Sequence, residues 1–171
     1  TMRALGIDLD GDGDVDVRDV KLLTPAKAAE IYMKHYFEKP GISKLPEALH
    51  ATVFDMQVNA GNNAVKILQR MLTNLGFTAA VDGGIGPGTI RAAQMAEKQM
   101  GGLALADAYG IARRNYYYGL ADGRPASRKY ARRTDGGKGG WITRAEELIS
   151  PKPHLSDAAQ RARGAKWGRP D

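Results

Sequence analysis

Apolar residues recur every three or four positions along most of the chain, which is the spacing of amphipathic helices. Thr24 and Pro25 are typical of the first turn of a helix, and Gly76 is placed to end another. Alternating patterns are scarce, so we expect an all-α protein, with at most a small β element near residues 8–19. The spacing predicts helices over about 25–37, 45–59, 65–75, 89–100, 103–121 and 141–149.

Three segments break this periodicity. Residues 81–89, VDGGIGPGT, are rich in glycine and should form a tight loop. Residues 122–140 are polar, basic and rich in glycine, which indicates an exposed connection. Residues 151–171 contain little apolar content besides Leu155 and Trp167, so we expect a basic tail lying on the rest of the protein.

Composition narrows the possible partners. The 171 residues include no cysteine, which excludes disulfides, thiolate zinc sites and a cysteine nucleophile. The sequence contains no apolar run long enough for a membrane-spanning helix and no signal peptide at its start. Residues 113–171 hold 14 Lys and Arg against 6 Asp and Glu, a net charge of +8, which favours an anionic partner.

Residues 8–19, DLDGDGDVDVRD, concentrate acid in this basic chain and match the calcium loop of an EF-hand position by position. Gly13 occupies the sixth position, where the chain must turn sharply, and Val15 the apolar eighth. Position twelve carries Asp19 in place of the usual Glu, which favours weaker binding. We expect the loop to be a structural calcium clip. The predicted ligands are Asp8, Asp10, Asp12, Asp14 through its carbonyl, Asp16 and Asp19.

The middle of the chain resembles a known family. FDMQVNAG (54–61), LQRML (68–72), VDGGIGPGT (81–89) and WITRAEE (141–147) are similar, in this order, to the lysozyme-like muramidases of glycoside hydrolase family 108, the secretion activator type, with their C-terminal predicted peptidoglycan-binding domain. The resemblance implies a lysozyme-like helical domain. It divides the chain into 1–60, the remainder of the muramidase domain with the loop at 8–19; 61–150, a peptidoglycan-binding helical region; and 151–171, the basic tail.

The resemblance also implies N-acetylmuramidase chemistry, in which a carboxylic acid protonates the leaving oxygen of a glycosidic bond. In the family the presumed catalytic glutamate lies in an EGG-type motif near the N-terminus, and we expect it upstream of Thr1. Asp55 lies in a matching motif, but it is not the family's acid. We therefore expect this chain to bind peptidoglycan without hydrolysing it, and the catalytic residue stays unknown. The alternative is a non-catalytic, calcium-stabilised peptidoglycan-binding module.

Three residues are candidates for contact with the glycan: Gln57, Asn59 and Tyr117. Amides suit sugar hydroxyls and aromatic faces suit their CH groups, although a share of the neighbouring tyrosines should be core residues. Peptidoglycan would place the protein at the bacterial wall or in the periplasm, including the case of a phage-encoded protein. Nucleic acid is the weaker hypothesis, because the basic residues Arg113, Arg114, Arg128, Lys129, Arg132 and Arg133 accompany no recognised nucleic-acid motif. The sequence does not indicate an oligomeric state.

Overall fold

A computed structural model describes residues 2–168, so Thr1 and the end of the tail, residues 169–171, lie outside the described residues. The described part is all helical, as predicted, and contains no strand. A single isolated bridge joins Arg132 to Lys138, far along the chain from the aspartate loop. The α-helices are α1 Met2–Leu5, α2 Val17–Lys21, α3 Pro25–Tyr32, α4 His50–Ala60, α5 Asn63–Asn74, α6 Pro87–Met100, α7 Gly102–Gly123, α8 Arg128–Ala131, α9 Gly140–Glu147 and α10 Asp157–Ala165.

Shorter elements modify the predicted helices. The first predicted helix begins as α3 and continues as a π-helix over Met33–Glu38. The second is preceded by two 3-10 turns, Ile42–Lys44 and Glu47–Leu49, so its α-helical part starts only at His50. The connection at 122–140 is more ordered than expected, since it contains the 3-10 turn Pro125–Ser127 and helix α8 and buries Ala131.

The predicted end of α5 is confirmed in detail. Gly76 has a positive φ of 92°, a conformation that costs glycine little. The N–H of Phe77 donates to the carbonyl of Leu72 at 2.9 Å, which is the wide turn of a Schellman motif. The chain can therefore leave α5 sharply and return through the glycine-rich loop to α6.

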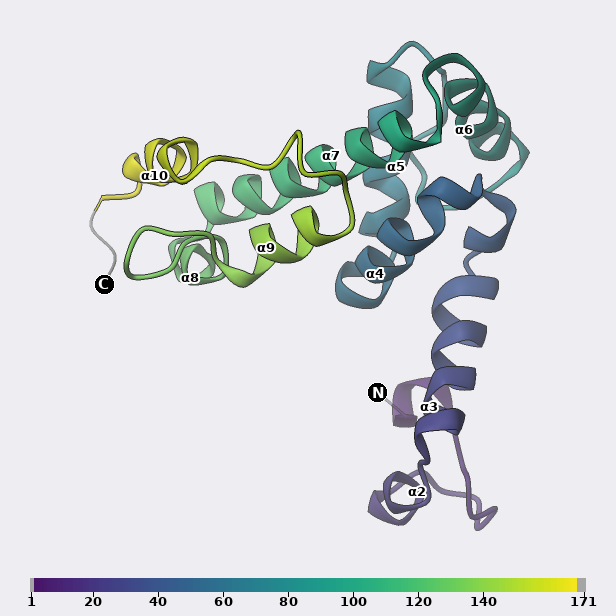
Figure 1. The fold of residues 1–171 in the computed structure, drawn as a ribbon. Coiled ribbons are helices and arrows are strands. Elements are labelled where there is room, and N and C mark those ends of the chain that lie inside the picture. Colours follow the sequence, from purple (N-terminus) through teal and green to yellow (C-terminus); the bar gives the residue numbers. More distant parts are fainter. Residues whose placement is uncertain (1, 169–171) are drawn as a thin grey trace.

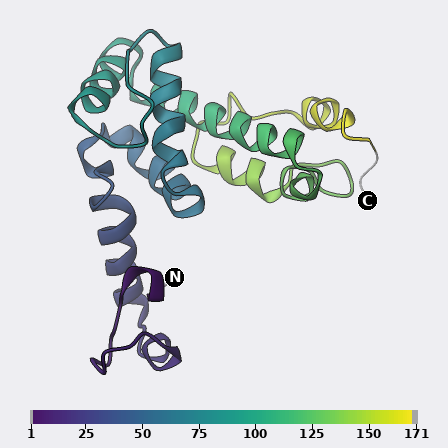
Figure 2. The same cartoon turned by 180° about the vertical axis from the view of Figure 1, so that it is seen from behind.

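Two regions differ in packing (Figures 1 and 2). The body, residues 42–168, packs α4, α5 and α6 beside the long helix α7, which continues outward with α9 along it. Its core joins residues as distant as Ile42 and Trp167. The arm, residues 2–38, projects from the body and carries the aspartate loop at its far end. Among residues 2–168, no helix has both the length and the apolar character needed to cross a membrane.

The C-terminal segment is tied to the body more firmly than a draped tail. Trp167 is buried, and its indole N–H donates to Asp122 at 2.7 Å. Arg132 donates to the carbonyls of Gly164 and Gly168, at 2.8 and 2.7 Å, respectively. These contacts hold α10 against α7 and α8, and they use Arg132, one of the basic groups that the sequence offered to an anionic partner.

Candidate functional site

Two cavities meet at one ion pair in the angle between the arm and the body. The first, of about 520 Å³, lies along α9 and the loop before it, and its lining includes Thr143, Arg144 and Glu147. The second, of about 410 Å³, lies between α3, the π-helix and α4, and its lining is mainly apolar and aromatic: Ala29, Tyr32, Met33, Phe54 and Val58. Asp55 and Arg144 line both cavities. We call the two cavities together the groove.

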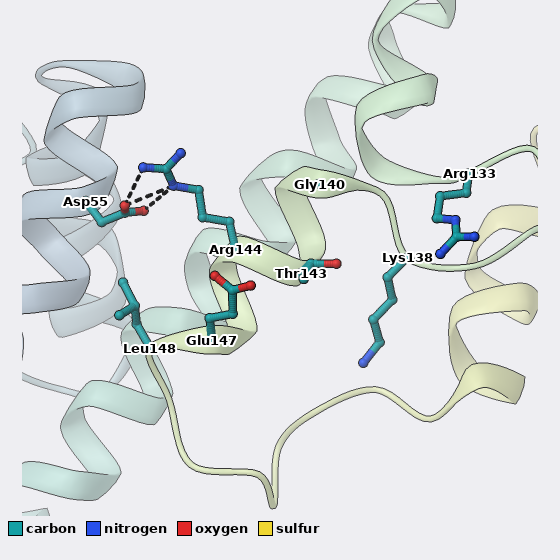
Figure 3. A pocket seen from close by; sticks show the side chains of 8 residues that line it. All are labelled: Asp55, Arg133, Lys138, Gly140, Thr143, Arg144, Glu147 and Leu148. Carbon is teal, nitrogen blue, oxygen red and sulfur yellow. Dashed lines mark hydrogen bonds and ion pairs between the residues drawn. The ribbon is translucent and has the colours of Figure 1, made fainter.

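Asp55 forms ion pairs with two arginines, Arg113 and Arg144. The Nε of Arg144 lies 2.9 Å from both carboxylate oxygens, and its Nη2 lies 2.6 Å from Oδ1 (Figure 3). From the other side, Nη2 of Arg113 donates to Oδ2 at 2.5 Å. Partial burial works to raise the pKa of Asp55, but the hydrogen bonds and charges of Arg144 and Arg113 outweigh it, so this pKa lies below its ordinary value. Asp55 is therefore held ionised and is poorly suited to donate a proton.

Arg113 is completely buried on α7. Besides Asp55, its Nη2 donates to the hydroxyl of Tyr117 at 3.4 Å. Its Nε and Nη1 are buried with no hydrogen-bond partner among the described residues. A buried guanidinium is costly unless it is paired, and here one shared carboxylate is its ion-pair partner.

Tyr117 and Asn59, two of the three predicted glycan contacts, are brought together. The Asn59 side-chain amide donates to the Tyr117 hydroxyl, which links the end of α4 to the pair formed by Arg113 and Asp55. Asn59 is exposed and can reach a ligand. The ring of Tyr117 is 1% exposed and stacks on Trp141 with a centroid distance of 4.9 Å, so it packs in the core and its face is not open to a sugar.

Gln57 lies elsewhere on α4. It is 6% exposed, and its Oε1 has no hydrogen-bond partner among the described residues. Gln57 also makes no side-chain hydrogen bond to Asn59 or Tyr117 within residues 2–168. The helical spacing explains the difference, because positions two apart on a helix point to different sides.

The sequence reasoning missed Arg113 and Arg144 as site residues. A signal for Arg113 was present: it falls four residues after Tyr109 and four before Tyr117, on the stripe of α7 that faces the core. A charged residue in such a stripe indicates a buried partner. Arg144 had no comparable signal, because it is exposed on α9 and meets Asp55 across 89 residues of sequence.

The glycine-rich motif at 81–89 has a structural role. Gln69, fully buried on α5, donates to Asp82 at 2.8 Å and to the carbonyl of Gly84 at 2.9 Å, and it accepts from the N–H of Gly83 at 2.9 Å. Hydrogen bonds from the Gly84 N–H and Gln69 hold the pKa of Asp82 below its ordinary value. These hydrogen bonds fix the loop against α5 and so position the start of α6.

The aspartate loop is held by hydrogen bonds between its own residues. Asp8 accepts from the N–H groups of Gly11 and Gly13, at 2.6 and 2.9 Å. Asp16 caps α2, and Asp19 returns to bond the N–H of Asp16 at 2.7 Å. Backbone N–H groups, that of Asp16 foremost, hold the pKa of Asp19 below its ordinary value.

Five of the six predicted calcium ligands, all but Asp12, fall into two groups of carboxylates in this loop. Carboxylate oxygens of Asp8, Asp10 and Asp19 lie within 4.8 Å of one another, as do those of Asp14, Asp16 and Asp19. The Arg18 guanidinium reaches Asp12 at 2.5 Å and Asp16 at 3.0 Å and so shares these carboxylates. An oxygen-only donor set of this kind suits a hard divalent cation.

Comparisons with known proteins gave two family matches, one after the other along the chain. Residues 2–61 match the family model described as Glycosyl hydrolase 108, and residues 63–146 match the one described as Predicted Peptidoglycan domain. Neither the comparison with curated proteins nor that with solved structures gave a significant match. The chain is therefore similar, in this order, to a glycosyl hydrolase 108 region and to a predicted peptidoglycan domain, an architecture that connects it to peptidoglycan.

Proposed function

We propose that this chain is a lysozyme-like protein that binds peptidoglycan in the groove. The observation that carries the proposal is the position of the groove at the junction of the two matched regions. Asp55 belongs to the glycosyl hydrolase 108 region and Arg144 to the predicted peptidoglycan domain, and both line the two cavities. A ligand lying in the groove would touch both regions at once.

The lining of the groove suits a glycan. Tyr32, Met33 and Phe54 offer apolar and aromatic surface to the CH faces of a sugar ring. Thr143 and Arg144, a short distance along the groove, offer hydrogen bonds to hydroxyl, amide or acid groups. Sugar sites in proteins combine these two kinds of surface. Asn59 supplies a further exposed amide near the same ion pair.

N-acetylmuramidase activity, the finer function that the family resemblance implies, needs a carboxylic acid that is protonated near neutral pH. Asp55, the carboxylate shared by both cavities, is kept ionised by Arg113 and Arg144 and cannot fill that role. We propose that the residues described here bind and orient the glycan and do not cleave it. The setting that follows is the bacterial wall or periplasm.

We further propose that Asp8, Asp10, Asp12, Asp14, Asp16 and Asp19 hold a calcium ion. Their oxygens would supply the six to eight ligands that calcium takes, with Asp14 contributing its carbonyl. The ion would neutralise the repulsion among these carboxylates and fix the loop before α2. Its role is structural, because the loop lies at the far end of the arm from the groove.

Sedimentation with purified sacculi, paired with a turbidity assay, tests the proposal. The wild-type chain should co-sediment with sacculi and leave their turbidity unchanged. Thr143→Trp, which places a large side chain in the first cavity, should weaken binding by roughly tenfold, equivalent to about 1.4 kcal/mol. Gln94→Trp, at an exposed position on α6, is the control and should bind like the wild type.

Two results would contradict the proposal. Lysis of sacculi by the wild-type chain would show that it holds its own proton donor; Glu147, exposed in the first cavity, would then be the first residue to replace. Binding to DNA with a steep salt dependence, without binding to sacculi, would instead favour a nucleic-acid partner.

A further inference from the structure

The ion-pair cluster at the centre of the groove has more positive than negative charge. Two guanidinium groups, those of Arg113 and Arg144, share the single carboxylate of Asp55. Glu147 also lines the first cavity, and its charge acts on Arg144 without an ion pair forming between them within the described residues. The other two cations of that cavity are engaged elsewhere, Arg133 with Asp135 and Lys138 with Glu146. Arg113 and Arg144 therefore have no second acid within ion-pair distance among the described residues.

The geometry shows where a second acid would bind. Arg144 uses Nε and Nη2 to hold Asp55, while its Nη1 makes no hydrogen bond within residues 2–168 and points away from Asp55 in Figure 3. The Arg144 side chain is 51% exposed, so a ligand can reach that edge. Guanidinium groups favour carboxylates because parallel N–H donors match the two oxygens.

Arg113 makes the arrangement asymmetric. It is buried behind Asp55, where no ligand reaches it directly, and two of its nitrogens have no partner in the described part of the chain. Its charge and that of Arg144 together hold the pKa of Asp55 below its ordinary value. Arg144 is thus the exposed cation of the two. A carboxylate on the ligand would be a second acid beside Asp55, so that each guanidinium would have an acid of its own.

We propose that Arg144 receives a free carboxylate of the peptide stem of peptidoglycan, so that the groove distinguishes stems that end in a carboxylate from those whose acid is amidated. This inference rests on the proposed peptidoglycan function and adds the chemical group that the groove selects. A carboxamide is neutral and has one acceptor oxygen in place of two, since its NH2 group is a donor like the guanidinium, so it loses the ion pair and one of the two hydrogen bonds. The expected preference is roughly tenfold or more in Kd.

The test uses two synthetic muropeptides that share sugars and peptide and differ only in a terminal carboxylate or carboxamide. Isothermal titration should give the wild type a preference of roughly tenfold or more for the acid. Arg144→Gln should bind both ligands with nearly the affinity that the wild type shows for the amide. Arg144→Lys, which keeps the charge but loses the parallel N–H donors of the guanidinium, should keep part of the preference. Arg91→Gln, at an exposed position on α6, is the matched control and should keep all of it.

The outcomes separate this inference from the function beneath it. If the wild type binds both muropeptides equally, or if Arg144→Gln keeps the preference, carboxylate selection by Arg144 is wrong while peptidoglycan binding stands. If the wild type binds neither muropeptide and does not sediment with sacculi, the proposed function fails as well. A thermal melt of Arg144→Gln that matches the wild type assigns its loss of preference to the missing charge.

Discussion

The body and the arm are stabilised in different ways. The body buries a continuous apolar core, in which Leu49, Val53, Leu68 and Leu72 are each fully buried. In the arm, residues 2–38, Asp19 is the one buried residue among those described, and Val17 and Val20 are 64% and 52% exposed. Apolar packing therefore dominates in the body, whereas the arm packs on the core through Phe37 at its end and is otherwise held by caps, turns and ion pairs. The second cavity of the groove is lined by residues of both regions, so its shape depends on both.

The largest expected effect comes from the buried charge network of the body. Glu146 is 3% exposed and bonds Arg114 at 2.8 Å, Lys138, and the N–H of Leu155 at 2.9 Å. Glu146→Gln would leave two cations without their acid and should lower the free energy of unfolding by about 3–5 kcal/mol. Urea denaturation followed by circular dichroism measures this. Glu147→Gln, one residue further and exposed, should change it by less than about 0.5 kcal/mol.

The same network predicts acid sensitivity of the body. Burial works to raise the pKa of Glu146, but hydrogen bonds and the nearby cations outweigh it and leave this pKa below its ordinary 4.5. A carboxyl with a depressed folded-state pKa stabilises the protein above its unfolded pKa, and this stability is lost as pH falls through the folded value. The wild type should therefore lose stability below about pH 4.5, and Glu146→Gln should lose less over the same range. Equal losses in both would contradict the assignment.

A pair of leucine truncations compares the two regions directly. Leu68→Ala removes a fully buried side chain from α5 and should lower the free energy of unfolding by about 2–5 kcal/mol. Leu22→Ala removes a side chain that is 52% exposed in the arm and should cost less than about 1 kcal/mol. Both variants can be measured by chemical denaturation. Similar losses would mean that the arm packs against something in solution, and the distinction between the two regions would then be wrong.

The smallest and most local effect should come from calcium. Adding the ion should slow amide hydrogen exchange in residues 8–23 and leave the exchange of α5 and α7 unchanged, because the loop and the core share no buried apolar contact. Chelation should reverse the change. Asp12→Asn with Asp16→Asn should abolish it, whereas Asp157→Asn at the start of α10 should not. Unchanged amide exchange in the loop at millimolar calcium would contradict the proposed calcium site.

The helices and their ends were largely predictable from local signals. Thr24 accepts a hydrogen bond from the N–H of Lys27 as the cap of α3, as predicted, whereas α6 begins at Pro87, two residues before its predicted start. The π-helix at Met33–Glu38 and the order in residues 122–140 were not predictable, since both depend on contacts with other parts of the chain. Of the site, the sequence indicated Asn59, but it could not show that Asp55 meets Arg113 and Arg144.

The sequence by itself determined the all-helical class, the glycine that ends α5, the aspartate loop and the order of the two family regions. These features depend on residues close together in the chain, where spacing and turn chemistry fix the local structure. Only the tertiary structure decided which charges are free. Arg113, Arg114 and Arg132 count toward the basic half of the sequence, yet packing buries them beside internal acids or carbonyls. Tyr117 is likewise buried, stacked on Trp141, while Arg144 remains exposed at the groove.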